Sequence, residues 1–148
     1  MTTPATPASQ PTLVLVTYEV PSTGENRSPE VLGALADEGL VHATTHPGLS
    51  RADFLLACPS DAAQGALLLR LRHTFPGALT WITDLVALSR PAQAGADLAR
   101  CLYDALHLLQ DAPVPVVYAY TEGGGVTLVV QRNQLATAQR LLDPRAEG

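Results

Sequence analysis

The stretch Leu79-Thr-Trp-Ile-Thr-Asp-Leu-Val-Ala-Leu88 lies near the middle of the 148-residue chain and separates two similar patterns of predicted elements. Its β-branched and apolar residues favour β-strand. Because Asp84 interrupts this apolar run, we expect two short strands, Leu79–Thr83 and Leu85–Ser89. The elements on either side of Asp84 then determine the fold.

The sequence before this stretch predicts two helices among three strands. Ser28 is a suitable N-cap for the first helix, because Pro29 follows it at a position that favours proline. Gly39 stands where a helix often ends in a left-handed residue, and Ser60 or Asp61 is expected to cap the second helix. In order, we predict a strand at 13–18, a helix from 28, strands at 40–45 and 53–58, and a helix from 60 to about 73 whose buried stripe is Leu67, Leu68, Leu71 and Phe75.

The sequence after this stretch predicts the same succession of elements. Apolar residues three and four positions apart predict the longest helix over Gln93–Gln110, and Pro113 prevents its continuation. Strands at 116–120 and 126–130, joined by three glycines, predict a β-hairpin. Asn133 is expected to cap a final helix that ends near Leu142.

Each half therefore has the order strand, helix, strand, strand, helix, with a period of roughly 70 residues. This repeat predicts an α+β fold of two ferredoxin-like βαββαβ units in tandem, with antiparallel sheets and helices on one face. We place the first unit at 12–83 and the second at 84–143. Residues 1–11 are rich in proline and uncharged, so we expect a flexible tail there and a disordered end at 144–148.

The composition excludes several classes of protein. With 47% hydrophobic and 16% charged residues, the chain is too apolar to be disordered throughout. Its net charge of −5 makes nucleic acid a poor partner, and the chain has no apolar run long enough for a membrane span. We also expect no secretory leader at 1–10, which has no basic start and no apolar stretch. We expect a cytoplasmic protein in which Cys58 and Cys101 are buried free thiols.

Several segments resemble the paired ACT domains at the C-terminus of aspartate kinases. Val20-Pro-Ser22 stands where those domains have Val-Pro-Asp after the first strand. Asp53–Pro59, followed by a helix, is similar to their third strand and second helix. Asp84–Ser89 stands where the family enters its second unit, and Pro115–Thr121 resembles its closing hairpin. The resemblance covers about 13–142 and implies the same tandem fold.

The sequence departs from this family at three places. Gly24-Glu25 stands where the first loop of the family has Pro-Gly. Ala94-Gly-Ala96 occupies the matching position of the second unit, and Thr121-Glu122 replaces a serine and a threonine. Only the proline-rich tail precedes the tandem, so we expect a protein without a kinase domain.

ACT domains bind small effectors, most often amino acids, in the loop between the first strand and first helix and at the domain interface. N–H groups at a helix start suit a carboxylate, and carbonyls or an acidic side chain suit an ammonium group. The alternatives are a polar turn at 22–26, a solvated surface arginine at 90 and an ordinary hairpin loop at 123–125. The resemblance implies these candidate ligand-binding residues: Ser22, Gly24, Glu25, Asn26, His46, Arg90, Gly95, Thr121, Glu122 and Gly123.

The sequence offers no metal, cofactor or catalytic site that we recognise. His42 and His46 lie on one face of a predicted strand, but about 13 Å apart at roughly 3.3 Å per residue, too far to share an ion. No nucleophile elbow, Cys-His arrangement or acid–base pair is present, and the glycines at 123–125 lack the context of a phosphate-binding loop. We therefore expect no metal, no cofactor and no enzyme activity.

Taken with the resemblance, these observations predict a regulatory protein that binds an amino acid and transmits its state to a partner. The mechanism would be a population shift, for which a coupling of about 1–3 kcal/mol is sufficient. A homodimer and an amino-acid biosynthetic enzyme are the expected partners. The first alternative is a ligand-free subunit that acts only by protein–protein contact, and the second is a small ferredoxin-like enzyme.

Overall fold

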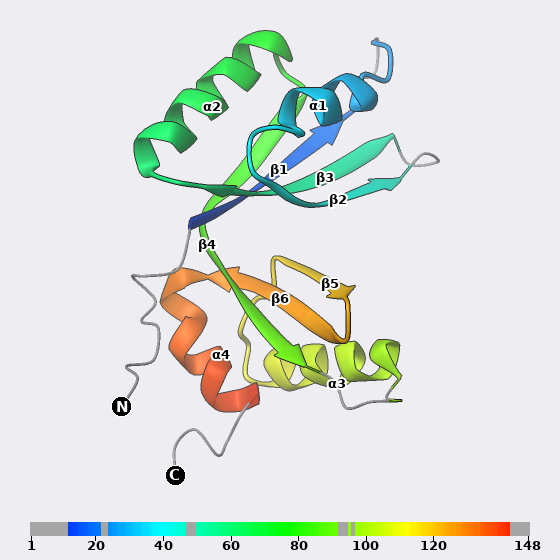
Figure 1. Cartoon of the computed structure of the whole chain (residues 1–148), viewed down its shortest axis with the longest axis vertical. Coiled ribbons are helices and arrows are strands. Elements are labelled where there is room, and N and C mark those ends of the chain that lie inside the picture. Colours follow the sequence, from blue (N-terminus) through cyan, green and yellow to red (C-terminus); the bar gives the residue numbers. More distant parts are fainter. Residues whose placement is uncertain (1–11, 22–23, 47–49, 92–94, 96, 143–148) are drawn as a thin grey trace. The chain divides into compact units, whose positions relative to one another are not determined.

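The computed structural model describes residues 12–21, 24–46, 50–91, 95 and 97–142, so the predicted tail at 1–11 and the predicted end at 144–148 lie outside the described residues. The elements are β1 (Thr12–Glu19), α1 (Ser28–Leu35), β2 (Leu40–His46), β3 (Arg51–Cys58), α2 (Asp61–Thr74), β4 (Leu79–Pro91), α3 (Leu98–Asp111), β5 (Tyr118–Glu122), β6 (Gly125–Gln131), the 3₁₀ turn η3 (Arg132–Gln134) and α4 (Leu135–Leu142) (Figure 1). The chain contacts define two compact units, one up to Asp84 and one from Leu85.

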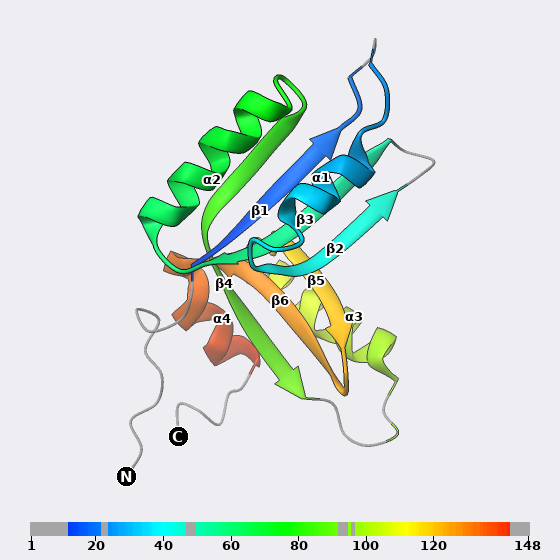
Figure 2. The ribbon, with the colours of Figure 1, turned by 45° about the horizontal axis from the view of Figure 1, so that its top comes forward.

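The first unit places two helices on one face of its strands. The strand order is β2-β3-β1-β4, and β3 pairs antiparallel with both β1 and β2. Figures 1 and 2 show α1 and α2 on the same side of these strands. Alternate residues of β1 and β3 point to that side, as the two-residue period of a strand requires. The core they form with the helices contains Val14, Val16, Tyr18, Phe54, Leu56, Val31, Leu35, Leu67 and Leu71.

The helix boundaries of the first unit follow local capping chemistry. Ser60 caps α2 as predicted, since its hydroxyl oxygen accepts a hydrogen bond from the Ala63 N–H at 3.1 Å. The N-cap of α1 is Arg27 and not the predicted Ser28. The reason is that Oδ1 of Asn26, two residues before Ser28, accepts a hydrogen bond from the Ser28 N–H at 3.0 Å. This side-chain hydrogen bond lies outside the helix pattern from which we predicted the boundary.

Gly39 returns the chain from α1 to β2 in a left-handed conformation, with φ of +86°. A methyl group at this position would collide with the carbonyl oxygen of Ala57. The two backbones approach this closely because the Ala57 N–H donates to the Gly39 carbonyl at 2.9 Å. Glycine is therefore required both by the dihedral angle and by the neighbouring strand.

The second unit has the strand order β4-β6-β5, with antiparallel pairing of β6 to both neighbours. Helices α3 and α4 lie on one side of these strands (Figure 1). The core contains Val86, Leu128 and Val130 from the strands and Ala105, Leu109, Leu135, Ala138 and Leu142 from the helices. An α+β fold with antiparallel strand pairs, and with four α-helices in the described part of the chain, is thus confirmed.

The prediction of two short strands around Asp84 was wrong, because β4 is one strand of 13 residues. Asp84 has φ of +60° inside it. A single residue with positive φ interrupts the extended backbone without ending the strand, as at a β-bulge. The sequence therefore indicated the irregular position correctly but not its consequence.

Two helices of the second unit begin later than predicted. The helix predicted from Gln93 begins at Leu98, because Gly95 has φ of +79° and Asp97 is the N-cap. The helix predicted from Asn133 begins with the turn η3 and becomes α-helical at Leu135. The strand predicted at 116–120 is β5 at 118–122, two residues later. None of the described helices has the length and hydrophobicity needed to cross a membrane.

Both cysteines are free thiols, but only Cys58 is fully buried, while Cys101 is half-buried. Burial raises the pKa of the Cys58 thiol, and the nearby Glu38 carboxylate raises it further. We expect Cys101 to react with Ellman's reagent at pH 8 at least tenfold faster than Cys58, because burial raises the pKa of the Cys58 thiol and also keeps the reagent away from it. Cys101→Ser should abolish the fast phase and Cys58→Ser should retain it; two equal rates in the native protein would contradict this assignment.

Candidate functional site

The loop between β1 and α1 holds the first group of predicted ligand-binding residues. Gly24, Glu25 and Asn26 are exposed, and Ser22 lies outside the described residues. The Gly24 N–H donates to the Pro21 carbonyl at 3.0 Å, which closes the first turn of the loop. The structure thus brings these three predicted residues together on one solvent-facing loop.

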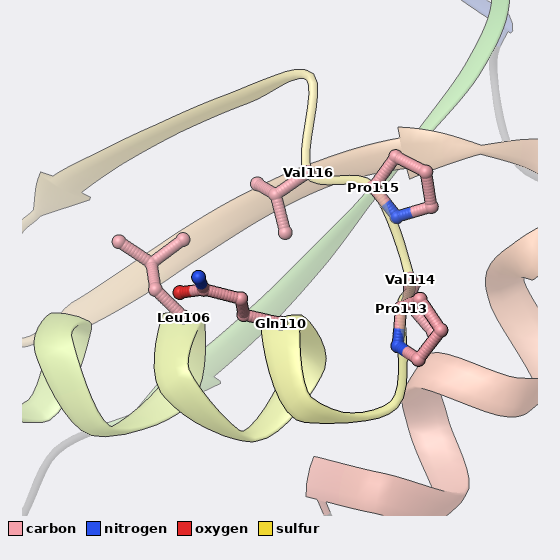
Figure 3. A pocket seen from close by; sticks show the side chains of 6 residues that line it. All are labelled: Leu106, Gln110, Pro113, Val114, Pro115 and Val116. Carbon is pink, nitrogen blue, oxygen red and sulfur yellow. The ribbon is translucent and has the colours of Figure 1, made fainter.

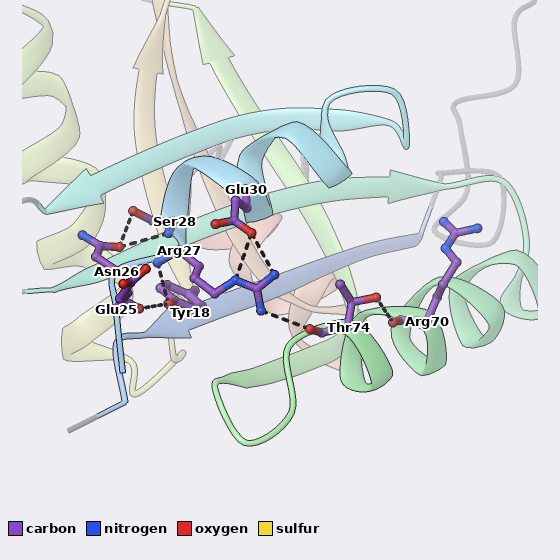
Figure 4. Close-up of polar contacts among 8 residues, drawn as sticks. All are labelled: Tyr18, Glu25, Asn26, Arg27, Ser28, Glu30, Arg70 and Thr74. Carbon is purple, nitrogen blue, oxygen red and sulfur yellow. Dashed lines mark hydrogen bonds and ion pairs between the residues drawn. The ribbon is translucent and has the colours of Figure 1, made fainter. Parts of the chain in front are cut away.

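The Tyr18 hydroxyl fixes the other end of this loop (Figure 4). It accepts a hydrogen bond from the Arg27 N–H at 2.8 Å and donates one to the Glu25 carbonyl at 3.3 Å. The ring of Tyr18 belongs to the core of the first unit and is 1% exposed. Because the ring cannot move without opening this core, the hydroxyl is a rigid anchor for the loop.

The Arg27 side chain ties the start of α1 to the end of α2. Its Nε and Nη2 atoms donate to one Glu30 carboxylate oxygen at 2.9 and 2.8 Å, and Nη1 donates to the Thr74 carbonyl at 3.3 Å. The guanidinium carbon lies 4.6 Å from the centroid of the Phe75 ring. The hydrogen bond to Glu30 raises the pKa of Arg27 above its ordinary value. Arg27 is therefore fully engaged in structure and is not available to a ligand.

The start of α1 has no free first-turn donor among its described N–H groups. Asn26 Oδ1 accepts from both the N–H and the hydroxyl of Ser28, at 3.0 and 2.7 Å. Pro29 has no N–H, and the N–H groups of Glu30 and Val31 donate to the Arg27 carbonyl at 2.9 and 3.0 Å. The expectation that this helix start receives an effector carboxylate therefore has no geometric support here.

His46 is the last residue of β2, and its backbone lies in register with Arg51 of β3 and, beyond it, Glu19 of β1. This row forms the end of the sheet from which the β1–α1 loop departs, since the Val20 N–H donates to the Ser50 carbonyl at 2.9 Å. The backbone of His46 is thus at the same end of the sheet as the loop. Its predicted contact with an effector stays a prediction.

In the second unit, strand register places Arg90 and Thr121 on one sheet face. Both residues pair with Val126, Arg90 from β4 and Thr121 from β5, so the three side chains point the same way. Val86 and Leu128 of this face contact α3 and α4, so it is the helix-covered face. Arg90 and Thr121 lie two strands apart, so their backbones are separated by roughly 9–10 Å. Both lie at the end of the strands where the loop to α3 begins.

Glu122 points to the opposite face, because its register partner is Gly125. Its neighbour on that face is Tyr120. Burial raises the pKa of Tyr120, and the Glu122 carboxylate raises it further, whereas a hydrogen bond from Thr127 lowers it. The strands therefore do not bring Glu122 to the same face as Arg90, with which we had grouped it. The sequence alone could not predict that Glu122 and Arg90 lie on opposite faces, because this depends on the register of β4, β6 and β5.

The remaining candidates lie in turns. Gly123, with φ of +57°, lies in the tight β5–β6 turn, which fits the alternative of an ordinary hairpin. Gly95 is exposed and precedes α3. At the start of α3, the Asp97 carboxylate accepts from Ala99 and Arg100 N–H groups at 3.0 and 3.4 Å. This cap leaves little room for an anion at the helix start.

A cavity of about 430 Å³ lies in the second unit between the end of α3 and the segment before β5 (Figure 3). It is lined by Leu106, Gln110, Pro113, Val114, Pro115 and Val116. The Gln110 amide is its single polar side chain, so the lining offers no charge to a zwitterion. Elsewhere, no three His, Cys, Asp or Glu side chains among the described residues come together as metal ligands.

Comparison with known proteins finds a similarity of structure. No family model and no curated protein matches the sequence. The structure is similar to aspartate kinase from Clostridium acetobutylicum, with a TM-score of 0.70 and 11% identity over 94% of this chain and 34% of that one. It is similar to the regulatory subunit of aspartate kinase from Thermus thermophilus, with a TM-score of 0.65 and 14% identity over 90% and 92% of the two chains. The chain has the fold of aspartate kinase regulatory domains.

The fold resemblance expected from the sequence is thereby confirmed. The chain spans about a third of the length of the Clostridium enzyme but matches the Thermus subunit almost end to end. E. coli aspartokinase III, solved in complex with lysine and aspartate, is also similar, with a TM-score of 0.57 and 14% identity over 92% of this chain and 31% of that one. At these low sequence identities the similarity establishes a shared fold and nothing further.

Proposed function

We propose that this chain is a regulatory protein of ACT type that binds a small amino acid and transmits its presence to a partner enzyme. In this proposal the two compact units are ferredoxin-like domains in tandem, with the boundaries 12–83 and 84–143. The protein performs no catalysis itself. Effector binding favours one packing of the protein over another, and a coupling of about 1–3 kcal/mol between effector and partner is sufficient.

The observation that carries the proposal is the position of Arg90. Among the described residues it has no carboxylate partner, and it shares a sheet face with Thr121. A guanidinium can hold a carboxylate in two hydrogen bonds, and a hydroxyl can accept from an ammonium group. An α-amino acid laid between them would reach both. In the first unit, the exposed Glu25 carboxylate and the loop carbonyls suit an ammonium group.

The comparisons support an amino acid as the effector class. E. coli aspartokinase III was solved with lysine and aspartate, and the Clostridium enzyme is described as allosteric. These properties belong to those proteins. For this chain they favour testing amino acids before other metabolites.

The test is thermal unfolding of the protein against each of the twenty amino acids. Ligand at a hundredfold excess over Kd adds about 2.7 kcal/mol of stability, which raises the Tm of a chain this long by several degrees. We expect one or a few amino acids to produce such a rise. Arg90→Ala should remove it, and Glu122→Ala, on the opposite sheet face, should retain it. Loss in Glu25→Ala instead would place the effector in the first unit, and retention in all three variants would contradict the proposed sites.

A second candidate is a ligand-free subunit that acts by protein–protein contact. It is favoured by the occupied helix starts, since Asn26 and Asp97 already take first-turn N–H groups of α1 and α3. No amino acid would then change the Tm, although the protein would be folded and would still bind its partner. In both cases we expect a homodimer, which sedimentation measures, and an amino-acid biosynthetic enzyme as the partner.

A further inference from the structure

A second cavity, of about 440 Å³, lies in the first unit at the end of α2. Its walls come from the last turns of α2, the connection at Gly77 and the start of β4. They consist of Arg72, Phe75, Gly77, Leu79, Thr80 and Trp81. None of these is a residue of the proposed amino-acid site. The volume is within the usual range for small-molecule sites, roughly 300–1,000 Å³.

Arg72 supplies a cation that no carboxylate of the described residues neutralises. Its guanidinium carbon lies 5.1 Å from the centroid of the Trp81 ring, and no carboxylate in the described part of the chain pairs with it. Arg70, two residues earlier on α2, differs in this respect because it pairs with Glu38 at 2.9 Å. A guanidinium stacked on an aromatic face keeps its N–H edge available for a carboxylate.

The rest of the lining is apolar and aromatic. The Phe75 ring is 3% exposed and Trp81 is half-buried, and both pack on the core of the first unit. The Thr80 hydroxyl is exposed and adds one group that donates or accepts a hydrogen bond. Nothing lies within 4 Å of the place where a side chain would start at Gly77, so this side of the cavity is open.

From this combination we propose that the cavity binds an aromatic carboxylate. The carboxylate pairs with Arg72, and the ring lies along the apolar wall formed by Leu79 and Trp81. A single cation matches a ligand of one negative charge better than a phosphate ester, which carries nearly two. This site is separate from the proposed amino-acid site and does not depend on it.

Trp81 makes the site observable, because it is the single tryptophan of the chain. Its indole N–H gives one resonance in a ¹H–¹⁵N spectrum of the full-length protein. We expect phenylacetate to shift this resonance saturably. Acetate, which lacks the ring, and benzylamine, which carries the opposite charge, should each shift it at least tenfold less at equal concentration. A Trp81 resonance that does not respond to phenylacetate, or responds equally to benzylamine, would overturn the proposal.

A pair of variants on one helix tests the role of Arg72. Arg72→Gln should weaken phenylacetate binding at least tenfold, whereas Arg70→Gln should leave it within twofold of the wild-type protein. Both side chains are exposed, so neither change is expected to disturb folding, and the rest of the spectrum checks this. Equal binding by both variants would overturn the proposal. Since Arg90→Ala should not affect this titration, failure here is distinguishable from failure of the amino-acid site.

Discussion

Replacing Gly39 by alanine is expected to destabilise the protein by about 3 kcal/mol or more. The left-handed dihedral angle of +86° alone costs an alanine about 1–2 kcal/mol. The added methyl group also collides with the Ala57 carbonyl oxygen, which belongs to backbone and cannot turn aside. Relief of this collision would separate the Ala57 N–H from the Gly39 carbonyl, now 2.9 Å apart. Urea unfolding followed by Trp81 fluorescence measures the loss.

Two other glycines serve as matched controls for this substitution. Gly77 also has a positive φ, +74°, but open space around it, so Gly77→Ala should cost only about 1–2 kcal/mol. Gly33 lies in α1 with nothing near it, so Gly33→Ala should stabilise the protein by about 0.5–1 kcal/mol. If Gly39→Ala costs no more than Gly77→Ala, the close approach to Ala57 is not what makes glycine necessary.

The order of strands and helices could be predicted because its determinants are local. The β-branched runs, the Ser60 cap and the stripe of Leu67, Leu68 and Leu71 each act within a few residues of sequence. Element boundaries were less predictable where a neighbouring side chain or dihedral angle intervened, as at Asn26, Asp84 and Gly95. These interventions are single-residue events that leave the apolar periodicity unchanged.

The candidate site was less predictable because it depends on contacts between distant segments. The sequence placed Arg90, Thr121 and Glu122 together, but only the register of β4, β6 and β5 separates Glu122 from the other two. The role of Tyr18 was missed altogether. A tyrosine at the end of an apolar strand fits a core position, and nothing in the pattern reveals that its hydroxyl meets a loop nine residues further on.

Truncating Tyr18 should therefore have two separable effects. Tyr18→Phe removes only the hydroxyl and leaves the part-buried Arg27 N–H without its acceptor, which should cost about 0.5–1.5 kcal/mol. Tyr18→Ala also removes a ring that is 1% exposed in the first core, so its total cost should reach about 3–5 kcal/mol. The difference between the two variants measures the contribution of the ring, and the first variant measures the anchoring of the loop.

Hydrogen exchange distinguishes loss of the anchor from general destabilisation. In Tyr18→Phe, the amide of Arg27 should lose protection more than the amides of β3, because its hydrogen-bond acceptor is gone while the core remains packed. Tyr103→Phe is the matched control, since Tyr103 is 56% exposed on α3 and its hydroxyl anchors no loop among the described residues. Unchanged protection of Arg27 in Tyr18→Phe would mean that the Arg27 side chain, through Glu30 and Thr74, holds the loop without help from the hydroxyl.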